Sequence, residues 1–229
     1  MDSFAMYLAL MKERPELFKN TGDQGEVKII LDPERIIAEQ KRIQAELRVE
    51  GHPEHWIDIG VLSEDQWFWT VRDMVEFPDG FVWGYLREIN RKNQDGGFGV
   101  VLLCLKDNQI LMIKKFRHDI RGWSWEFPRG FGEPEKTSEE NARTELFEEV
   151  GATDAELELL AEVKEGKGGT AVYIARLSST QEIKVDTREG IAGYKWVSLG
   201  ELEEIISQGL LTDWFSIWTY ALAKTKRAL

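Results

Sequence analysis

The pattern of apolar and polar positions divides the chain into a helical beginning, a β segment and a longer mixed remainder. Residues 1–55 predict two helices, and the second begins at Asp32-Pro33, where aspartate is a good cap and proline suits the first turn. The apolar positions that recur at helical spacing are Phe4, Tyr7, Leu8, Met11, Ile36, Ile43 and Leu47. This portion carries no motif tied to chemistry, so packing or interaction is its expected role.

Residues 56–95 predict a β segment. Two runs, 67–77 and 81–89, are rich in aromatic and β-branched residues, and the turn signal Pro78-Asp79-Gly80 separates them. Residues 96–229 then combine short strands with a few helices. Strands are expected at 100–105, 110–116, 125–127, 157–163, 170–175 and 194–197, and closing helices at 199–207 and 211–223. This order predicts an α/β/α sandwich around a mixed sheet, preceded by the β segment and the helical extension.

The segment from Gly130 to Ala152 predicts a loop, a helix and a stop. Thr137 with Glu140 three residues later forms a capping box, and Gly151 occupies the position where a left-handed conformation ends a helix. The helix carries an apolar stripe at Ala142, Leu146 and Val150.

Three carboxylates, those of Glu145, Glu148 and Glu149, crowd one side of this expected helix. Like charges at that spacing repel each other, and no Lys or Arg follows them within the turn. A divalent cation, Mg2+ or Mn2+, would neutralise such a set of hard oxygen ligands. The alternative is a solvated acidic helix on an acidic protein.

These residues resemble the Nudix box, the signature of hydrolases that cleave diphosphates linked to another moiety. The matching positions are Gly130, Glu145, Leu146, Glu148, Glu149, Gly151 and Ala152. Lys136 and Thr144 depart from the pattern, because the family has Glu and Arg there, and that pair braces the loop against the helix. Glu135 and Arg143, one residue earlier, have the same mutual spacing and form a conceivable shifted pair.

The resemblance extends beyond the box to ADP-ribose pyrophosphatase-type Nudix enzymes. The similar stretches are TVRDMVEFPDG, ILMIKKFRHDI, SWEFPRG and GYKWVSLGELEEIISQGLLTDWFSIWTYAL. It implies a Nudix domain over residues 96–229 and a homodimer in which residues 65–90 cross to a partner and sites use both chains. Residues 1–55 lie outside the similarity.

The same resemblance implies roles at the site. Mg2+ or Mn2+ would be held by Glu145, Glu149 and Glu148 with a backbone carbonyl of Arg129 or Gly130. Glu189 is the candidate late-loop base or ligand, with Asp186 as second choice and a solvated loop acid as the alternative.

Arg117 aligns with a phosphate-binding arginine of these relatives, and its planar fork suits bidentate phosphate contact. A surface ion pair is the alternative. Arg129 is a second candidate for phosphate, or it pairs with a nearby acid, and His118 is expected to be structural.

Nine tryptophans leave room for a base-stacking platform, although core or interface packing accounts for most. The candidates are Trp67, Trp69, Trp83, Trp123 and Trp125. The stretch LLAEVKEGKGGTAVYIA contains no proline, and in the ADP-ribose-type relatives a proline there often marks the substrate class. This departure weakens ADP-ribose as the specific substrate.

Composition narrows the remaining choices. A net charge of −12 over 229 residues argues against a nucleic-acid binder, which normally shows a basic face. The single Cys104 excludes an intrachain disulfide and is expected to pack as a small hydrophobe. No run is long enough to span a membrane and no signal peptide is evident, so we expect a cytoplasmic protein.

Two hypotheses follow. The first is a metal-dependent Nudix hydrolase that cleaves an ADP-ribose-like nucleoside diphosphate derivative into a nucleoside monophosphate and a sugar phosphate. The second is a Nudix-fold binding or sensor protein that has lost turnover, which Lys136 and Thr144 favour.

Overall fold

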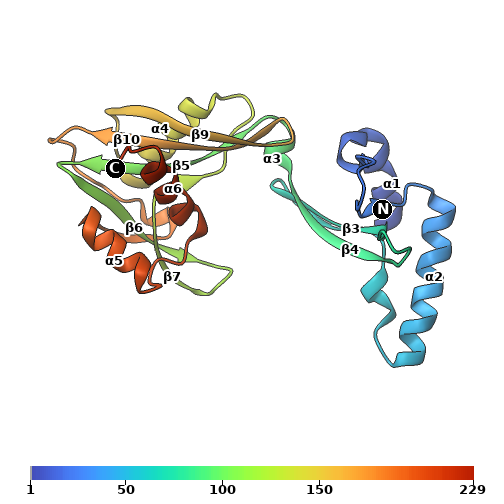
Figure 1. Ribbon diagram of the computed structural model, residues 1–229. Coiled ribbons are helices and arrows are strands. Elements are labelled where there is room, and N and C mark those ends of the chain that lie inside the picture. The colour runs from blue at the N-terminus through green and yellow to red at the C-terminus, as the bar shows by residue number, and fades with distance from the viewer. Residues whose placement is uncertain (1) are drawn as a thin grey trace. The chain divides into compact units, whose positions relative to one another are not determined.

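The computed structural model in Figure 1 describes residues 2–229, and the chain divides after Arg91 into two compact units. The elements of the first unit are α1 (Ser3–Glu13), the 3₁₀ helix η1 (Pro15–Phe18), β1 (Lys28–Ile29), α2 (Pro33–Glu50), the 3₁₀ helix η2 (Glu54–Ile57), β2 (Gly60–Glu64), β3 (Phe68–Glu76) and β4 (Val82–Asn90). The Asp32 side chain caps α2 by accepting a hydrogen bond of 3.1 Å from Glu34 N–H. In the described chain, no helix is long and apolar enough to cross a membrane.

The helices and strands of the first unit share one hydrophobic core. Tyr7 of α1 and Ile36 of α2 are fully buried together with Val71 of β3. The Tyr7 hydroxyl donates to Asp73 Oδ1 at 2.7 Å, and Arg87 of β4 pairs with the same carboxylate at 2.6 Å. The boundary expected at residue 55 therefore lies inside this unit, because the helical extension and the β segment pack as one body.

The second unit is built on one mixed sheet. Its elements are α3 (Arg91–Gln94), whose first residue is the last of the first unit, β5 (Phe98–Lys106), β6 (Gln109–Arg117), β7 (Gly122–Glu126), β8 (Arg129–Gly130), α4 (Ser138–Val150), β9 (Ala155–Glu165), β10 (Gly168–Leu177), the 3₁₀ helix η3 (Thr187–Glu189), β11 (Ile191–Ser198), α5 (Leu199–Ser207) and α6 (Trp214–Thr225). The strands run in the order β11-β6-β5-β10-β9, with β7 on β6 and β8 on β5. Strands β5 and β10 are parallel, and the other pairs are antiparallel.

Helices cover both faces of this sheet. Alternate residues of the apolar strand β5 point to opposite sides, so each face of the sheet has apolar side chains to bury. Leu102 and Cys104 share a hydrophobic core with the apolar side of α4, whereas Val101 and Leu103 share a second core with residues of α5 and α6. Cys104 is fully buried, as expected for a small hydrophobe. The predicted α/β/α sandwich is confirmed.

The sheet splits where the candidate site lies. Strands β5 and β6 pair only at Leu105↔Ile110 and Lys106↔Gln109 and then diverge, so that β6 continues with β7 and β5 with β8. The Pro128 carbonyl between β7 and β8 accepts the Leu102 N–H at 2.9 Å and ties this crossing to the central strand. The crossing delivers Arg129 and Gly130 beside helix α4.

Candidate active site

Local signals define both ends of helix α4. Thr137 Oγ1 accepts the Glu140 N–H at 3.2 Å, and Glu140 Oε2 accepts the Thr137 N–H at 2.8 Å, which completes the predicted capping box. Gly151 ends the helix in the left-handed region at φ 69°, also as predicted. Because the apolar side of α4 packs on the sheet, its acidic side meets the loop that begins at Gly130.

The three acids differ in exposure: Glu148 is exposed, Glu145 is half-buried and Glu149 is only 1 % exposed. A Cβ at Gly130 would lie 2.1 Å from the Glu145 carboxyl carbon, which no real contact permits. The absence of a side chain at Gly130 therefore lets the loop backbone approach the carboxylate of Glu145.

Glu145 has an unfavourable environment for its charge. No hydrogen bond or ion pair within residues 2–229 reaches its carboxylate. Burial raises the pKa of Glu145 to about 8, and the neighbouring charges of Glu149 and Glu148 add to the rise. A half-buried carboxylate without a donor suits a divalent cation. In the described chain, however, no three His, Cys, Asp or Glu side chains are grouped so that they could already hold a metal ion.

Glu149 is neutralised by the protein itself. The Lys115 ammonium of β6 forms a short ion pair with Glu149 Oε1, and the Arg129 N–H donates to Glu149 Oε2 at 2.9 Å. Burial nevertheless raises the pKa of Glu149, and Lys115 opposes this rise. The expectation of acids without a protein counter-ion was wrong, because it considered only neighbours along α4 and Lys115 comes from a strand.

Alternation in β6 explains how Lys115 reaches the site. Leu111 and Ile113 pack against the α4 face of the sheet, so Lys115 two residues later points to the same side. The strand pattern was visible in the sequence, but the partner of Lys115 depends on where α4 docks.

Glu189 also lies near these groups. Its Oε2 is 3.7 Å from Lys115 Nζ, and its side chain is half exposed. Asp186 instead caps η3 by accepting the Arg188 N–H at 2.8 Å, while its own N–H contacts the Glu149 carbonyl at 3.4 Å. Of the two loop acids, Glu189 is the one whose carboxylate lies within ion-pair distance of Lys115 in the described chain.

The two candidate phosphate-binding arginines each have an acidic partner. Arg117 Nε donates to Glu126 Oε2 at 2.8 Å, and a second guanidinium nitrogen contacts Oε1 of this fully buried carboxylate. Arg129 Nη2 pairs with Asp213 Oδ1 at 2.9 Å. Glu126 and Asp213 were missed from the sequence. No sequence signal marked Glu126, because alternation in β7 places it on the side of Gly122 and Ser124 and not on that of the tryptophans.

The positions that depart from the Nudix box face each other. Lys136 Nζ lies 3.2 Å from Thr144 Oγ1, so a neutral hydroxyl replaces the charged partner at this contact. Arg143 binds Glu139 at 2.8 Å and the Ala155 carbonyl at 3.2 Å. These bonds leave the shifted Glu135–Arg143 pair unformed in the described chain.

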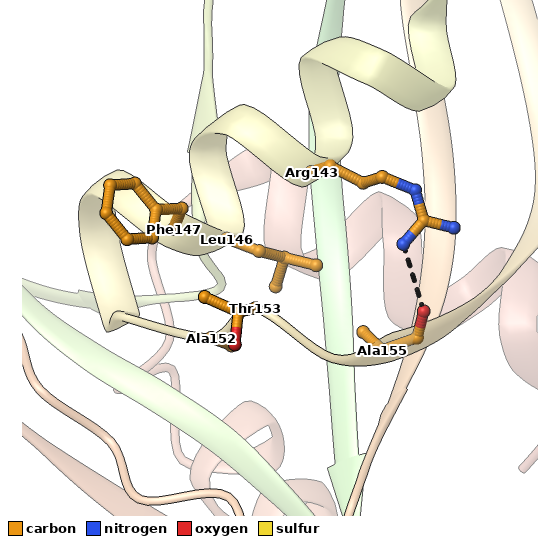
Figure 2. Close-up of a pocket in the computed structure, with 6 residues that line it drawn as sticks. All are labelled: Arg143, Leu146, Phe147, Ala152, Thr153 and Ala155. Atoms are coloured by element: carbon orange, nitrogen blue, oxygen red, sulfur yellow. Dashed lines mark hydrogen bonds between the residues drawn. The ribbon is translucent and has the colours of Figure 1, made fainter.

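Figure 2 shows Arg143 at the rim of a pocket beside the end of α4, with its hydrogen bond to the Ala155 carbonyl dashed. The pocket is lined by Arg143, Leu146, Phe147, Ala152, Thr153 and Ala155. It contains none of the three acids of α4 and forms no part of the candidate site.

The remaining candidates separate by environment. His118 contacts Arg121 at 2.6 Å in the exposed turn between β6 and β7. Trp69 is buried and Trp83 packs against the core of the first unit, whereas Trp123 is 51 % exposed. The other two candidates, Trp67 and Trp125, are partly buried.

An α/β/α sandwich with a glycine loop and a carboxylate-bearing helix at the split of its sheet defines the Nudix class of domain. The family model described as NUDIX domain matches residues 94–215, more than half of the chain. The chain belongs to the Nudix family, as its box residues predicted.

Individual relatives match shorter segments of the chain than the family model does. The chain is 31 % identical over 64 residues to an RNA pyrophosphohydrolase of Serratia proteamaculans (28 % of this chain, 34 % of the relative). It is 34 % identical over 61 residues to one of Erwinia tasmaniensis (27 % and 33 %). The matches therefore span about a third of the length of these relatives. A solved ADP compounds hydrolase shares the fold, with a TM-score of 0.54, 16 % identity, and coverage of 74 % of this chain and 91 % of that one.

Proposed function

We propose that the protein is a Mg2+- or Mn2+-dependent hydrolase of an ADP-ribose-like nucleoside diphosphate derivative, which releases a nucleoside monophosphate and a sugar phosphate. Membership of the Nudix family supports hydrolase activity in general. The observation that carries the proposal is Glu145, a half-buried carboxylate without a protein donor, set against the Gly130 loop and beside Glu149.

The acids of α4 and the loop backbone would hold the cation. Glu145, Glu148 and Glu149 supply carboxylate oxygens, and Gly130 or Arg129 supplies a carbonyl. A bound cation of this kind polarises a phosphoryl oxygen and lowers the pKa of a coordinated water. Glu149 is held in place for this role by the Arg129 N–H.

The other residues would act on the water and the diphosphate. Glu189, half exposed at the edge of the site, takes the proton of the attacking water as general base. Arg117 and Arg129 bind phosphate oxygens with guanidinium groups that their acidic partners Glu126 and Asp213 already orient.

We further propose a homodimer formed through strand β4. In the described chain β3 is the only strand that pairs with β4, so a strand of another chain could pair with its outer edge. Phe81 and Tyr85 near this edge are each more than half exposed, and Leu86 is 50 % exposed. Light scattering on the intact protein tests this, and a monomer at micromolar concentration would contradict it.

The second candidate function is a sensor that binds such a ligand without turnover. Two observations favour it: Lys115 occupies Glu149, and the family brace is reduced to the Lys136–Thr144 contact. Either feature lowers the affinity of the site for a divalent cation.

A substrate panel separates the two functions. ADP-ribose, NADH, FAD, UDP-glucose, diadenosine polyphosphates and an RNA with a terminal pyrophosphate are incubated with Mg2+ or Mn2+, and products are resolved by chromatography. The wild type is compared with Glu149→Gln and with Glu139→Gln, a matched control at an exposed acid of the same helix that binds Arg143. We expect Glu149→Gln to lose most activity and Glu139→Gln to keep it. Tight binding of one compound without turnover supports the sensor. A protein that neither binds nor hydrolyses any compound of the panel refutes both functions.

A further inference from the structure

Lys115 is a partly buried cation inside the acidic site of the described chain. Its side chain is 13 % exposed and contacts two carboxylates, a short pair with Glu149 and a longer one of 3.7 Å with Glu189. Lys114, the next residue, lies on the opposite side of the strand with its ammonium 5.6 Å from the Trp123 ring. The strand therefore presents one lysine to the site and one to the other face.

Each carboxylate oxygen of Glu149 already accepts a hydrogen bond from the protein in this arrangement. Lys115 takes Oε1, the Arg129 N–H takes Oε2, and the side chain is 1 % exposed. A divalent cation at Oε1 would lie within a few ångströms of the Lys115 ammonium. Two positive charges at that separation repel each other, so the ammonium and the cation would compete for this carboxylate.

We propose that Lys115 is an internal counter-ion that competes with the divalent cation for Glu149. This inference rests on the proposed function, because it concerns the regulation of the same site. Without the cation, Lys115 neutralises Glu149 and keeps the carboxylate at the α4–β6 contact. When the cation binds, Lys115 leaves Glu149 and stays with Glu189 or meets a phosphate oxygen.

The chemistry of lysine suits this exchange. Its ammonium is a compact charge on a flexible stem with rotatable donors, so it moves between partners without the fixed geometry that a guanidinium requires. Glu189 is half exposed and already within 4 Å, which gives the ammonium a second partner toward solvent. The consequence is a weaker cation affinity than the bare acids would have.

Mn2+ binding to the substrate-free protein tests the competition. Titration calorimetry compares the wild type with Lys115→Met and Lys115→Gln, and Lys114→Met serves as a control with the same loss of charge on the opposite face. We expect both Lys115 variants to bind Mn2+ about tenfold tighter or more, a change of about 1.4 kcal/mol, and Lys114→Met to match the wild type. Equal or weaker binding by the Lys115 variants, or an equal gain in Lys114→Met, overturns the proposal.

A second measurement uses the wild type alone, since loss of Lys115 leaves Glu149 without its partner and can impair folding. Acetylation of lysine amines, read by mass spectrometry, reports the exposure of Lys115 with and without Mn2+. We expect Mn2+ to increase modification of Lys115 while that of Lys114 stays constant. Unchanged modification of Lys115 at saturating Mn2+ overturns the exchange. Neither experiment needs turnover, so a protein that hydrolyses nothing on the panel can still confirm or refute this inference.

Discussion

Replacing Glu145 with glutamine should stabilise the metal-free protein at alkaline pH while removing its response to metal. The wild-type carboxylate is half-buried, lies beside Glu149 and Glu148, and receives no donor within residues 2–229. Glutamine keeps the shape of the side chain and removes the charge. A charge that destabilises the metal-free fold at this position is expected if its role is to bind a cation.

The magnitude follows from the pKa of Glu145, which rises from an ordinary 4.5 to about 8. Below about pH 4.5 the folded and unfolded states are both protonated, so the group contributes nothing. Between 4.5 and 8 the folded state holds a proton that the unfolded state has lost, so stability falls as pH rises. Above about 8 the full penalty applies. At about 1.4 kcal/mol per pKa unit, and discounted for water that reaches the group, it is on the order of 2–4 kcal/mol.

Thermal unfolding with EDTA measures this effect at pH 4 and pH 9. We expect the Glu145→Gln melting temperature to match that of the wild type at pH 4 and to exceed it at pH 9 by about 4–16 °C, from about 2–4 °C per kcal/mol. Glu139→Gln is the control, because Glu139 is an exposed acid of the same helix that pairs with Arg143. Saturating Mg2+ should raise the melting temperature of the wild type and leave that of Glu145→Gln unchanged. A Glu145→Gln protein no more stable than the wild type at pH 9 would refute the reasoning.

Three other substitutions probe the supports of the site. Asp213→Ala removes the cap of α6 and the partner of Arg129, so urea unfolding should show a loss of about 2–4 kcal/mol; an unchanged midpoint would contradict this. The double variant Lys136→Glu/Thr144→Arg restores the family brace, and a double-mutant cycle should give a favourable coupling of about 0.5–1 kcal/mol; zero coupling would show that the two positions do not interact. Gly130→Ala places a methyl group 2.1 Å from the facing carboxyl carbon, so calorimetry should show Mn2+ binding weakened about tenfold or more; wild-type affinity would mean that the close approach does not matter.

Helix α4 shows what local sequence can predict. Thr137, Glu140 and Gly151 specify its ends through contacts with their own neighbours, and the structure has the same ends. The apolar stripe also identified the side that packs on the sheet. Each of these features depends on residues within one or two turns, so no knowledge of the fold was needed.

Contacts between distant segments were harder to predict. The ion pair of Lys115 with Glu149 joins residues 34 apart in the chain and depends on how α4 docks against β6. The same limit applies to Arg129 and Asp213, which are 84 apart. The helical extension and the β segment were expected as separate parts for a related reason, because periodicity identifies an apolar face without naming the surface that covers it.

Under the proposed function, Glu145 and its neighbours would hold a cation that the protein needs in order to hydrolyse a diphosphate. The most direct test is the rate of AMP formation from ADP-ribose, measured side by side for the wild type and Glu145→Gln with Mg2+ and with EDTA. We predict AMP and ribose phosphate only from the wild type with Mg2+. Equal rates in EDTA, or an undiminished rate in Glu145→Gln, would contradict the account.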